Sequence, residues 1–407
     1  MTYSVVNDKC LEAMRQMEEC SVDALVCDGP YAISFMGSKW DSFGRRTGNE
    51  TVTERKKKAG DYAIENKGAP RYGNSHGHAP DRNENVAFQE AMTPVFGEAL
   101  RVAKPGAYLL AFGSPRTFHR LACAIEDAGW MPRDTIMWVY SQGYPKGLNV
   151  SKAFERRGDT ELAERWAGWN SQLKPAFEPI LVAQKPLDGT IVHNVSEWGV
   201  GAMNIDACRV PSEPYDASRD GEATADKDYR DSGVLSLQSK PGPRGGDPKG
   251  RFPANLVHDG SEEVRACFPD AKGQQGDLRA GIPKRTGVCY GDFPPTNEHT
   301  KRVEYDTSAA RFFYCAKATK KDRNSGGVTN DHVSVKPNAL MRWLVRLVCP
   351  QGGMVLDPFM GSGSTGVACM QEGMSFVGVE MDPHYCDIAK ARIDAAFCEQ
   401  RQMELPL

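Results

Sequence analysis

A carboxylate and an aromatic side chain follow a short apolar run near the start of the chain. Residues 22–31 read VDALVCDGPY, and Asp28 ends the run. Gly29 and Pro30 then form a turn that presents Tyr31. The exocyclic amine of a nucleobase is a poor nucleophile, because its lone pair is delocalised into the ring. The Asp28 side chain and the Gly29 carbonyl could accept its two N–H bonds and localise that lone pair, while Tyr31 could stack on a flipped base. The alternative is a plain strand-end turn, because Asp, Gly and Pro all favour turns.

A second candidate site is a glycine-containing loop near the other end of the chain. Residues 355–366 read VLDPFMGSGSTG, in which Asp357 ends an apolar run and two glycines let the backbone approach a ligand. The next helix is expected to begin at Ser364 or Thr365. Glu380 ends the following strand, where a carboxylate suits hydrogen bonds to ribose hydroxyls. The whole unit predicts an adenosine-containing cofactor, and the alternative is an ordinary strand–helix turn without a ligand.

The first of these segments resembles a known catalytic loop. DGPYAISFMGSKWD (28–41) is similar to the loop of the amino-group DNA methyltransferases, whose pattern is Asp/Asn/Ser-Pro-Pro-Tyr/Phe. The chain departs at Gly29, which keeps the carbonyl acceptor but lacks the fixed φ of proline. Phe35, Lys39 and Trp40 match a common continuation of the loop and could equally be packing residues. The resemblance implies four catalytic positions: Asp28, Gly29, Pro30 and Tyr31.

The second segment resembles the methyl-donor loop of the same family, which implies S-adenosylmethionine as the cofactor. By this resemblance Phe359, Gly361 and Gly363 line the methionine and adenosine moieties, and Glu380 holds the ribose. HVSVKPNALM (332–341) is similar to the segment that covers the methionine end, although its asparagine could instead cap the next helix. The implied cofactor-binding positions are Asp357, Pro358, Phe359, Gly361, Gly363, Glu380, Lys336, Pro337 and Asn338.

The order of the two loops implies a subgroup. The catalytic loop precedes the donor loop, which resembles the permuted β group, and SQLKPAFEPILVAQKP (171–186) resembles phage- and prophage-type modification enzymes. The expected domains are 1–189 as the catalytic half, 190–331 as a target-recognition module and 332–407 as the cofactor half. Specificity is expected to lie in the inserted module.

The elements that must position these loops follow from periodicity. Short apolar runs predict buried strands, and stretches with helical spacing lie between several of them. Strands that alternate with helices predict an α/β fold with a doubly wound, mainly parallel, Rossmann-like sheet and an irregular inserted module. The expected strands are 24–27, 107–112, 180–183, 355–356 and 376–379, and the expected helices are 88–102, 118–128, 339–349 and 385–397.

Two charged stretches are candidates for contact with DNA phosphates. Residues 42–85, expected to be a mobile loop, hold nine basic and six acidic residues, and residues 272–323 hold eleven and six. The first could be a solvated loop without a partner. Within the second, RFFYCAK (311–317) interleaves basic and aromatic residues, but FFYCA could equally be a buried strand.

Composition limits the class of protein. The net charge of -3 excludes a uniformly basic nucleic-acid binder, so double-stranded DNA must be bound by local patches. The 12 cysteines form no CxxC pair, which argues for reduced thiols and against a metal site. Because no signal peptide or membrane span is apparent, we expect a cytoplasmic protein of a bacterial or phage-infected cell, with a homodimer left open.

The expected function is site-specific DNA methylation at an exocyclic amino group, with adenine N6 favoured by Asp28 through the family resemblance. Cytosine N4 is the neighbouring alternative, and a protein-glutamine or RNA amine methyltransferase shares the loop chemistry. A catalytically impaired DNA- or cofactor-binding protein is a second class, with Gly29 as the lesion. A nicotinamide-dependent oxidoreductase is a third, disfavoured because the loop lacks GxGxxG directly after the strand.

Overall fold

Two compact units make up the chain in the computed structural model. One unit combines Met1–Asn204 with Ala316–Leu407, and the other is Ile205–Cys315. The described residues are 1–33, 39–43, 82–141, 143, 147–211, 249–271, 285–288, 291–293, 308–316, 320–332 and 334–404.

The first unit is built on one sheet. Its strands are β1 (Tyr3–Asn7), β2 (Val22–Cys27), β3 (Ala103–Phe112), β4 (Met131–Val139), β5 (Phe177–Gln184), β10 (Met354–Asp357) and β11 (Ser375–Glu380). They follow the order β1-β11-β10-β2-β3-β5-β4. Neighbours from β1 to β3 are parallel, whereas β5 is antiparallel to both β3 and β4. The predicted mainly parallel sheet is confirmed.

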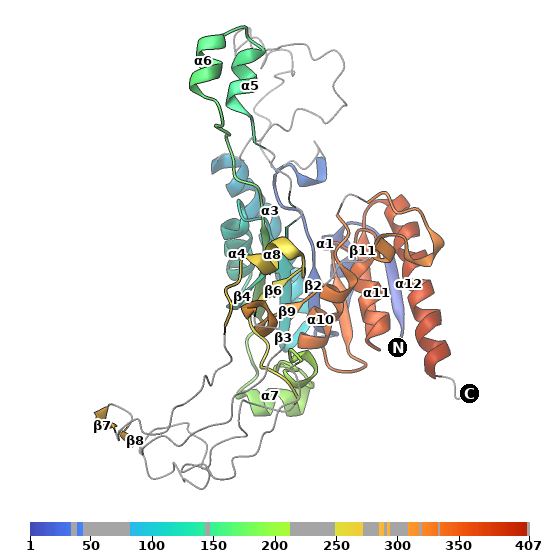
Figure 1. Cartoon of the computed structure of the whole chain (residues 1–407). Helices are drawn as coiled ribbons and strands as arrows, with labels where there is room; N and C mark the ends of the chain where they lie inside the picture. Colours follow the sequence, from blue (N-terminus) through green and yellow to red (C-terminus); the bar gives the residue numbers. More distant parts are fainter. Residues whose placement is uncertain are drawn as a thin grey trace. The chain divides into compact units, whose positions relative to one another are not determined.

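The first unit also contains helices, and two groups of them cover the two faces of the sheet. The helices are α1 (Cys10–Arg15), α3 (Arg82–Val102), α4 (Phe118–Asp127), α5 (Val150–Glu155), α6 (Thr160–Arg165), α7 (Ile191–Trp198), α9 (Lys320–Arg323), α10 (Asn338–Val348), α11 (Ser364–Gln371) and α12 (Pro383–Glu404). α1, α3 and α4 pack together as one layer, and α10, α11 and α12 form the other (Figure 1). This arrangement confirms the predicted doubly wound α/β fold.

The core lies between the sheet and its helices. Every residue of β2 is buried, and the aromatic side chains of Phe88, Phe96 and Trp130 fill the space beneath α3 and α4. The Trp130 indole N–H donates to the Phe96 carbonyl (2.9 Å), which satisfies its polar atom inside the core. A strand buried on both faces is fixed on both sides, so the residues at its carboxyl end are held firmly.

The inserted unit has little regular structure among its described residues. Its elements are β6 (Leu256–His258), α8 (Glu262–Ala266), β7 (Arg285–Val288), β8 (Gly291–Phe293) and β9 (Tyr314–Cys315), with 3-10 turns at Asp206–Cys208 and Ala309–Phe312. β6 pairs in parallel with β9, and β7 pairs antiparallel with β8. The alternative of a buried strand through FFYCA is therefore only partly right, because a 3-10 turn ends at Phe312 and the strand begins at Tyr314.

The compact inserted unit is narrower than the predicted recognition module of residues 190–331. α7 belongs to the first unit, because it packs on β3. The buried Asn194 side chain on α7 donates to the carbonyls of Pro105 (2.9 Å) and Val200 (2.7 Å). Most of the basic stretches at 42–85 and 272–323, together with Phe35, lie outside the described residues.

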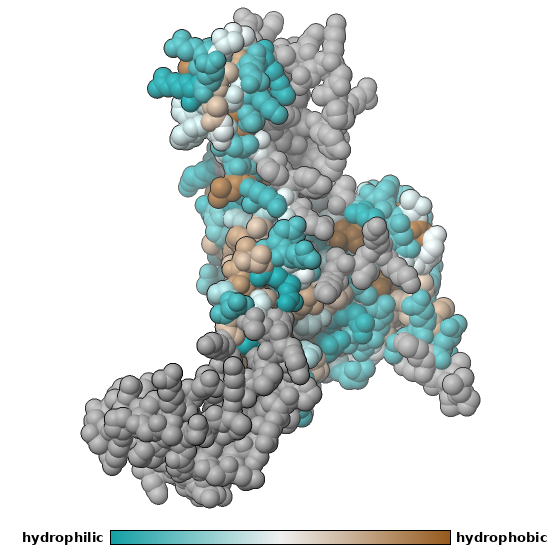
Figure 2. Space-filling model, viewed as in Figure 1, coloured by the Kyte–Doolittle hydropathy of each residue, from teal (hydrophilic) through white to brown (hydrophobic). Residues whose placement is uncertain are grey.

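The described surface of the first unit is mixed in character. Figure 2 shows hydrophilic side chains over most of α5 and α6 and around α10 to α12, with small hydrophobic areas between them. Trp169 and Leu173, beside α6, are among the exposed large apolar side chains. Among the described residues, no helix is both long enough and apolar enough to cross a membrane.

Candidate active site

The two loops singled out in the sequence meet at one edge of the sheet. β2 and β10 are parallel neighbours, with Leu25 opposite Leu356, so both strands end side by side. A cavity lies beyond these ends. Its lining residues are Asp28, His332, Ser334, Lys336, Met341, Asp357, Phe359, Met360, Gly361, Ser362, Ser364 and Thr365. The catalytic loop and the donor loop therefore open onto the same space.

Asp28 is held by contacts to both of its carboxylate oxygens. The Tyr31 hydroxyl lies 2.8 Å from Oδ1. Lys336 Nζ lies 3.0 Å from Oδ2, and the Ser334 hydroxyl donates to the same oxygen at 3.2 Å. The carboxylate is thus oriented by partners from two distant parts of the chain, and it faces the cavity.

Lys336 contacts residues of the catalytic loop and also lines the cavity beside the donor loop. Its ammonium contacts Asp28, Glu178 (2.8 Å) and the Tyr31 hydroxyl (3.1 Å), and it lies 4.9 Å from the centroid of the Phe112 ring. Burial alone would lower the pKa of Lys336, but the two carboxylates raise it above its usual value. The lysine is therefore a permanent cation between two anions.

Glu178 was missed by the sequence analysis. It lies near the start of β5, where the Tyr31 hydroxyl is 3.0 Å from Oε2 and the Tyr140 hydroxyl is 3.4 Å from Oε1. Because β5 runs antiparallel to β3, with Phe112 opposite Ile180, the start of β5 reaches the edge at which the parallel strands end. Segment 171–186 was singled out by resemblance, but its strand direction could not be read from the sequence. His332, whose pKa burial lowers, is another lining residue that was not proposed.

The turn after Pro30 is fixed by a buried carboxylate. Asp41 accepts the backbone N–H groups of Tyr31 (2.6 Å), Ala32 (2.6 Å) and Ile33 (3.1 Å). Ala32 adopts a left-handed conformation (φ 54°), which a non-glycine residue keeps only when its surroundings hold it. Burial, and then the neighbouring carboxylates, raise the pKa of Tyr31 well above its usual value, so its hydroxyl stays protonated.

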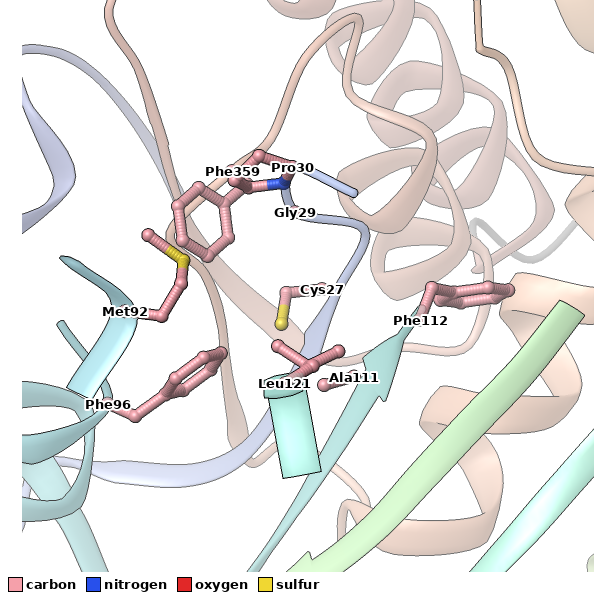
Figure 3. Close-up of a pocket in the computed structure, with 9 residues that line it drawn as sticks. All are labelled: Cys27, Gly29, Pro30, Met92, Phe96, Ala111, Phe112, Leu121 and Phe359. Atoms are coloured by element: carbon pink, nitrogen blue, oxygen red, sulfur yellow. The ribbon is translucent and has the colours of Figure 1, made fainter. Parts of the chain in front are cut away.

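Gly29 packs against the donor loop. A Cβ added at this position would lie 3.0 Å from Cδ2 of Phe359, closer than side chains normally pack. Figure 3 shows the Phe359 ring beside Gly29 and Pro30, with Met92 and Phe96 of α3 beyond it. The close approach gives a physical reason for glycine where the family pattern has proline.

Asp357 is a buried carboxylate at the end of β10. It accepts the Thr365 hydroxyl at 2.5 Å and the Phe359 backbone N–H at 3.0 Å. Burial raises the pKa of Asp357 from 3.8 to about 7, against the lowering effect of these hydrogen bonds. The pKa of Asp357 therefore lies near neutral pH, and a cation in the cavity would favour its ionised form.

The backbone conformation of the rest of the donor loop agrees with the expected glycine turn and helix start. Gly361 (φ 52°) and Gly363 (φ 82°) both adopt left-handed conformations, and α11 begins at Ser364 as expected. The Glu380 carboxylate accepts the backbone N–H groups of Gly361 (3.0 Å) and Asp382 (2.8 Å). Gly363 is close to α12, since a Cβ there would lie 2.9 Å from the Ala389 Cβ.

The structure brings some of the proposed residues to the cavity and not others. The proposed residues that are not among its lining residues are Gly29, Pro30, Tyr31, Pro337, Asn338, Pro358, Gly363 and Glu380. The possible helix cap by Asn338 is wrong, because α10 begins at this residue and its side chain donates instead to Gln371 on α11 (2.7 Å). Trp40 is 47% exposed, so it is not a core packing residue.

The cavity fits the cofactor that the sequence implies. S-adenosylmethionine carries an ammonium and a sulfonium, and the lining residues include the carboxylates of Asp28 and Asp357. The donor-loop backbone lines it without a side chain at Gly361, where a Cβ would lie 2.9 Å from His332 Nε2. The absence of a side chain at Gly361 lets a ligand approach the backbone closely. The two carboxylates favour a ligand that is a cation.

Comparison with known proteins decides the family. A family model described as DNA methylase, N6_N4_Mtase, matches residues 22–391. The chain belongs to this family. As a member of the N6/N4 DNA methylases, it uses S-adenosylmethionine to methylate an exocyclic amino group at a specific DNA site.

Two individual relatives align with the methylase at less than 30% sequence identity. The methylase is 28% identical over 396 residues to the Type II methyltransferase M.HindIII of Haemophilus influenzae, covering 97% of this chain and 96% of that protein. It is 27% identical over 188 residues to the Type II methyltransferase M.Cfr9I of Citrobacter freundii, covering 43% and 62%.

Solved structures align with the methylase at low similarity. The PvuII DNA methyltransferase (cytosine-N4-specific) gives a TM-score of 0.45 at 11% identity, covering 99% of this chain and 93% of that one. The M1.HpyAVI–SAM complex gives 0.38 at 14% identity, covering 96% and 100%. The fold described above rests on the methylase's own sheet order.

Proposed function

We propose that Asp28 and the Gly29 carbonyl hold the amino group of a flipped base, and that this base is adenine, methylated at N6. The observation that carries the proposal is the shared cavity, in which Asp28 and the donor-loop residues Asp357, Phe359 and Gly361 line one space. Direct transfer requires the acceptor and the donor to meet, and this common lining supports such a meeting.

The residues of the catalytic loop act on the amine. Accepting its two N–H bonds at Asp28 and at the Gly29 carbonyl localises the nitrogen lone pair, and Asp28 then takes the surplus proton. Tyr31 offers an aromatic ring for stacking, and its contact with Asp28 (2.8 Å) orients that ring. S-adenosylmethionine, when bound, supplies the electrophilic methyl group.

The donor is held by residues of the second loop and of the segment before it. Asp357 attracts a cationic part of the donor, while Phe359, Gly361 and Gly363 shape its surroundings and Glu380 accepts from the ribose. Lys336 and Pro337 are buried beside this space, and Pro358 and Asn338 support the loop and the start of α10. These roles agree with the positive φ of both glycines and the buried Asp357 carboxylate.

The choice of base and the assignment to a subgroup both rest on the family resemblance. Asp28 at the head of the catalytic loop favours adenine by family resemblance, and cytosine N4 remains the alternative on the same fold. We assign the chain to the permuted β group of phage- or prophage-type modification enzymes, with double-stranded DNA as its partner and target reading by the module of residues 190–331. M.HindIII and M.Cfr9I carry the name Type II methyltransferase, which supports a place in restriction–modification.

The test compares wild type with Asp28→Asn, using donor labelled in its methyl group and bacterial DNA. We expect label in DNA, recovered as N6-methyladenine by mass spectrometry of digested nucleosides. Asp28→Asn should lower the rate at least about 100-fold, because an anionic acceptor is lost, while donor affinity falls by no more than about 10-fold because Asp357 and the donor loop still line the cavity. Glu126→Gln, an exposed carboxylate on α4, is the matched control and should behave as wild type.

Each alternative has its own outcome. Recovery of N4-methylcytosine would overturn the choice of base and leave the site intact. Donor binding by wild type without transfer to any natural DNA would favour the impaired binding protein. Full activity of Asp28→Asn would reject the proposed site.

A further inference from the structure

Three ionisable side chains and one hydroxyl form a closed cluster beside the cavity. Lys336 Nζ lies 3.0 Å from Asp28, 2.8 Å from Glu178 and 3.1 Å from the Tyr31 hydroxyl. The side chains are 7% exposed for the lysine, 18% for Asp28 and 17% for Glu178. In such a place an unbalanced charge is costly, so the sum of the charges matters.

The cluster holds one more negative charge than positive. An ammonium has three N–H donors, and each of the three on Lys336 has one acceptor here. If Asp28 alone faced the lysine, the pair would be neutral. Glu178 supplies a second carboxylate, so the site keeps a net charge of about -1 toward the cavity that Asp28 lines.

The Tyr31 hydroxyl couples the two carboxylates. It lies 2.8 Å from Asp28 Oδ1 and 3.0 Å from Glu178 Oε2, but it has a single proton to donate. Its oxygen also accepts from Lys336. The position of Glu178 therefore affects how strongly Tyr31 and Lys336 engage Asp28.

We infer that Glu178 is a positioning residue of the methylation reaction, which balances Lys336 so that Asp28 keeps its negative charge available for the substrate amine. The inference rests on the proposed role of Asp28. It goes beyond that role, because residue 178 lies in the segment 171–186, to which the resemblance assigns no site residue.

The reaction explains why a net negative charge is needed. As the bond from nitrogen to the methyl carbon forms and the bond from sulfur to that carbon breaks, a positive charge passes from the sulfur to the amine nitrogen. The amine proton then moves to the Asp28 carboxylate. A site with a net charge of about -1 opposes this positive charge throughout, whereas a neutral Asp28–Lys336 pair would give little stabilisation.

The experiment is a double-mutant cycle on the full-length protein with Glu178→Gln, Lys336→Met and both together. Two quantities are measured: the urea midpoint of unfolding without donor, and the single-turnover rate of methyl transfer to DNA. Glu178→Asp is the conservative variant, because it keeps the negative charge on a shorter side chain. The matched control is the Asp23–Lys104 pair (2.6 Å) at the start of β2, changed to Asp23→Asn, Lys104→Met and both.

Glu178→Gln should lower the transfer rate on the order of 100-fold, because Asp28 is then neutralised by Lys336, while the urea midpoint stays near that of wild type because the remaining pair is neutral. The double variant should transfer at least about 10-fold faster than Glu178→Gln alone, because removal of the lysine leaves Asp28 negatively charged again. Glu178→Asp should keep most of the rate. The Asp23 variants should change the midpoint while the rate stays within about threefold.

Additive losses in the cycle, or a wild-type rate for Glu178→Gln, would overturn the inference. If Glu178→Gln does not fold, the comparison of Glu178→Asp with the double variant decides, because loss of rate in the charge-conserving variant would contradict charge balance. The proposed function fails separately, if Asp28→Asn keeps its activity or if wild type transfers no methyl group to DNA.

Discussion

Burial controls the charge of Asp357, which is 2% exposed at the end of β10. Burial raises the pKa of this carboxyl from 3.8 to about 7 in the folded protein. Between these values the native state binds a proton that the unfolded chain has lost. The contribution of Asp357 to the free energy of unfolding is therefore largest below pH 4, falls as the pH rises to about 7 and is constant above that.

Donor binding should release a proton at Asp357. A cation in the cavity favours the ionised carboxylate, so at pH 6 the bound state holds fewer protons than the free protein. Calorimetry of S-adenosylmethionine binding in buffers of different ionisation enthalpy should show proton release at pH 6 and little at pH 8.5. Asp357→Asn should remove this buffer dependence, and identical proton release in wild type and Asp357→Asn would contradict the assignment.

Asp41 shows how one side chain sets the geometry of a whole turn. It is fully buried and accepts the N–H groups of three consecutive residues, 31–33. Asp41→Ala would leave those donors without this acceptor and destabilise the protein by about 1–3 kcal/mol. Because the turn carries Tyr31, we also expect transfer to slow at least about 10-fold, with donor affinity unchanged.

The control for this prediction is Asp127→Ala, an exposed carboxylate that accepts from Gln89 (2.7 Å). It should alter neither stability nor rate measurably. Urea unfolding and single-turnover kinetics check both variants. Equal transfer rates for Asp41→Ala and wild type would mean that the turn does not need its buried acceptor.

Strands with a continuous apolar run were predictable from the sequence, and those with an interrupted run were not. The apolar runs correctly predicted β2, β3, β5, β10 and β11. β1 ends the strand order and its burial pattern alternates, while most residues of β4 are exposed or half-buried. An edge strand tolerates polar residues, so its apolar run is interrupted and the signal is lost.

The same distinction applies to the site. Asp28 and Asp357 could be found because each lies in a local motif at a strand end. Glu178 could not, because its approach to Asp28 depends on the antiparallel direction of β5. Lys336 was found as part of a segment, but its contact with Glu178 became visible only in the folded chain.

At the scale of the whole molecule, the two chemical loops belong to one unit, and DNA recognition is proposed for the other. The net charge of -3 gives no general attraction to DNA, so binding must depend on local groups. Both chemical loops belong to the unit formed by Met1–Asn204 and Ala316–Leu407, whose core is continuous across the two segments because β10 pairs with β2. The unit Ile205–Cys315 contributes neither loop, which leaves target reading as its proposed role.

This division predicts the effect of replacing residues 205–315 by a flexible Gly/Ser linker of about 20 residues. The remaining unit keeps its sheet and both loops, so we expect a cooperative thermal transition and a donor affinity within about threefold of wild type. Affinity for DNA that contains the target site should fall about 1,000-fold, because only sequence-independent contacts remain. Sequencing of methylated positions in expressing cells should show loss of the site-specific pattern. If the shortened protein still methylates the same sequence, target reading must lie in the unit that carries Asp28 and Asp357.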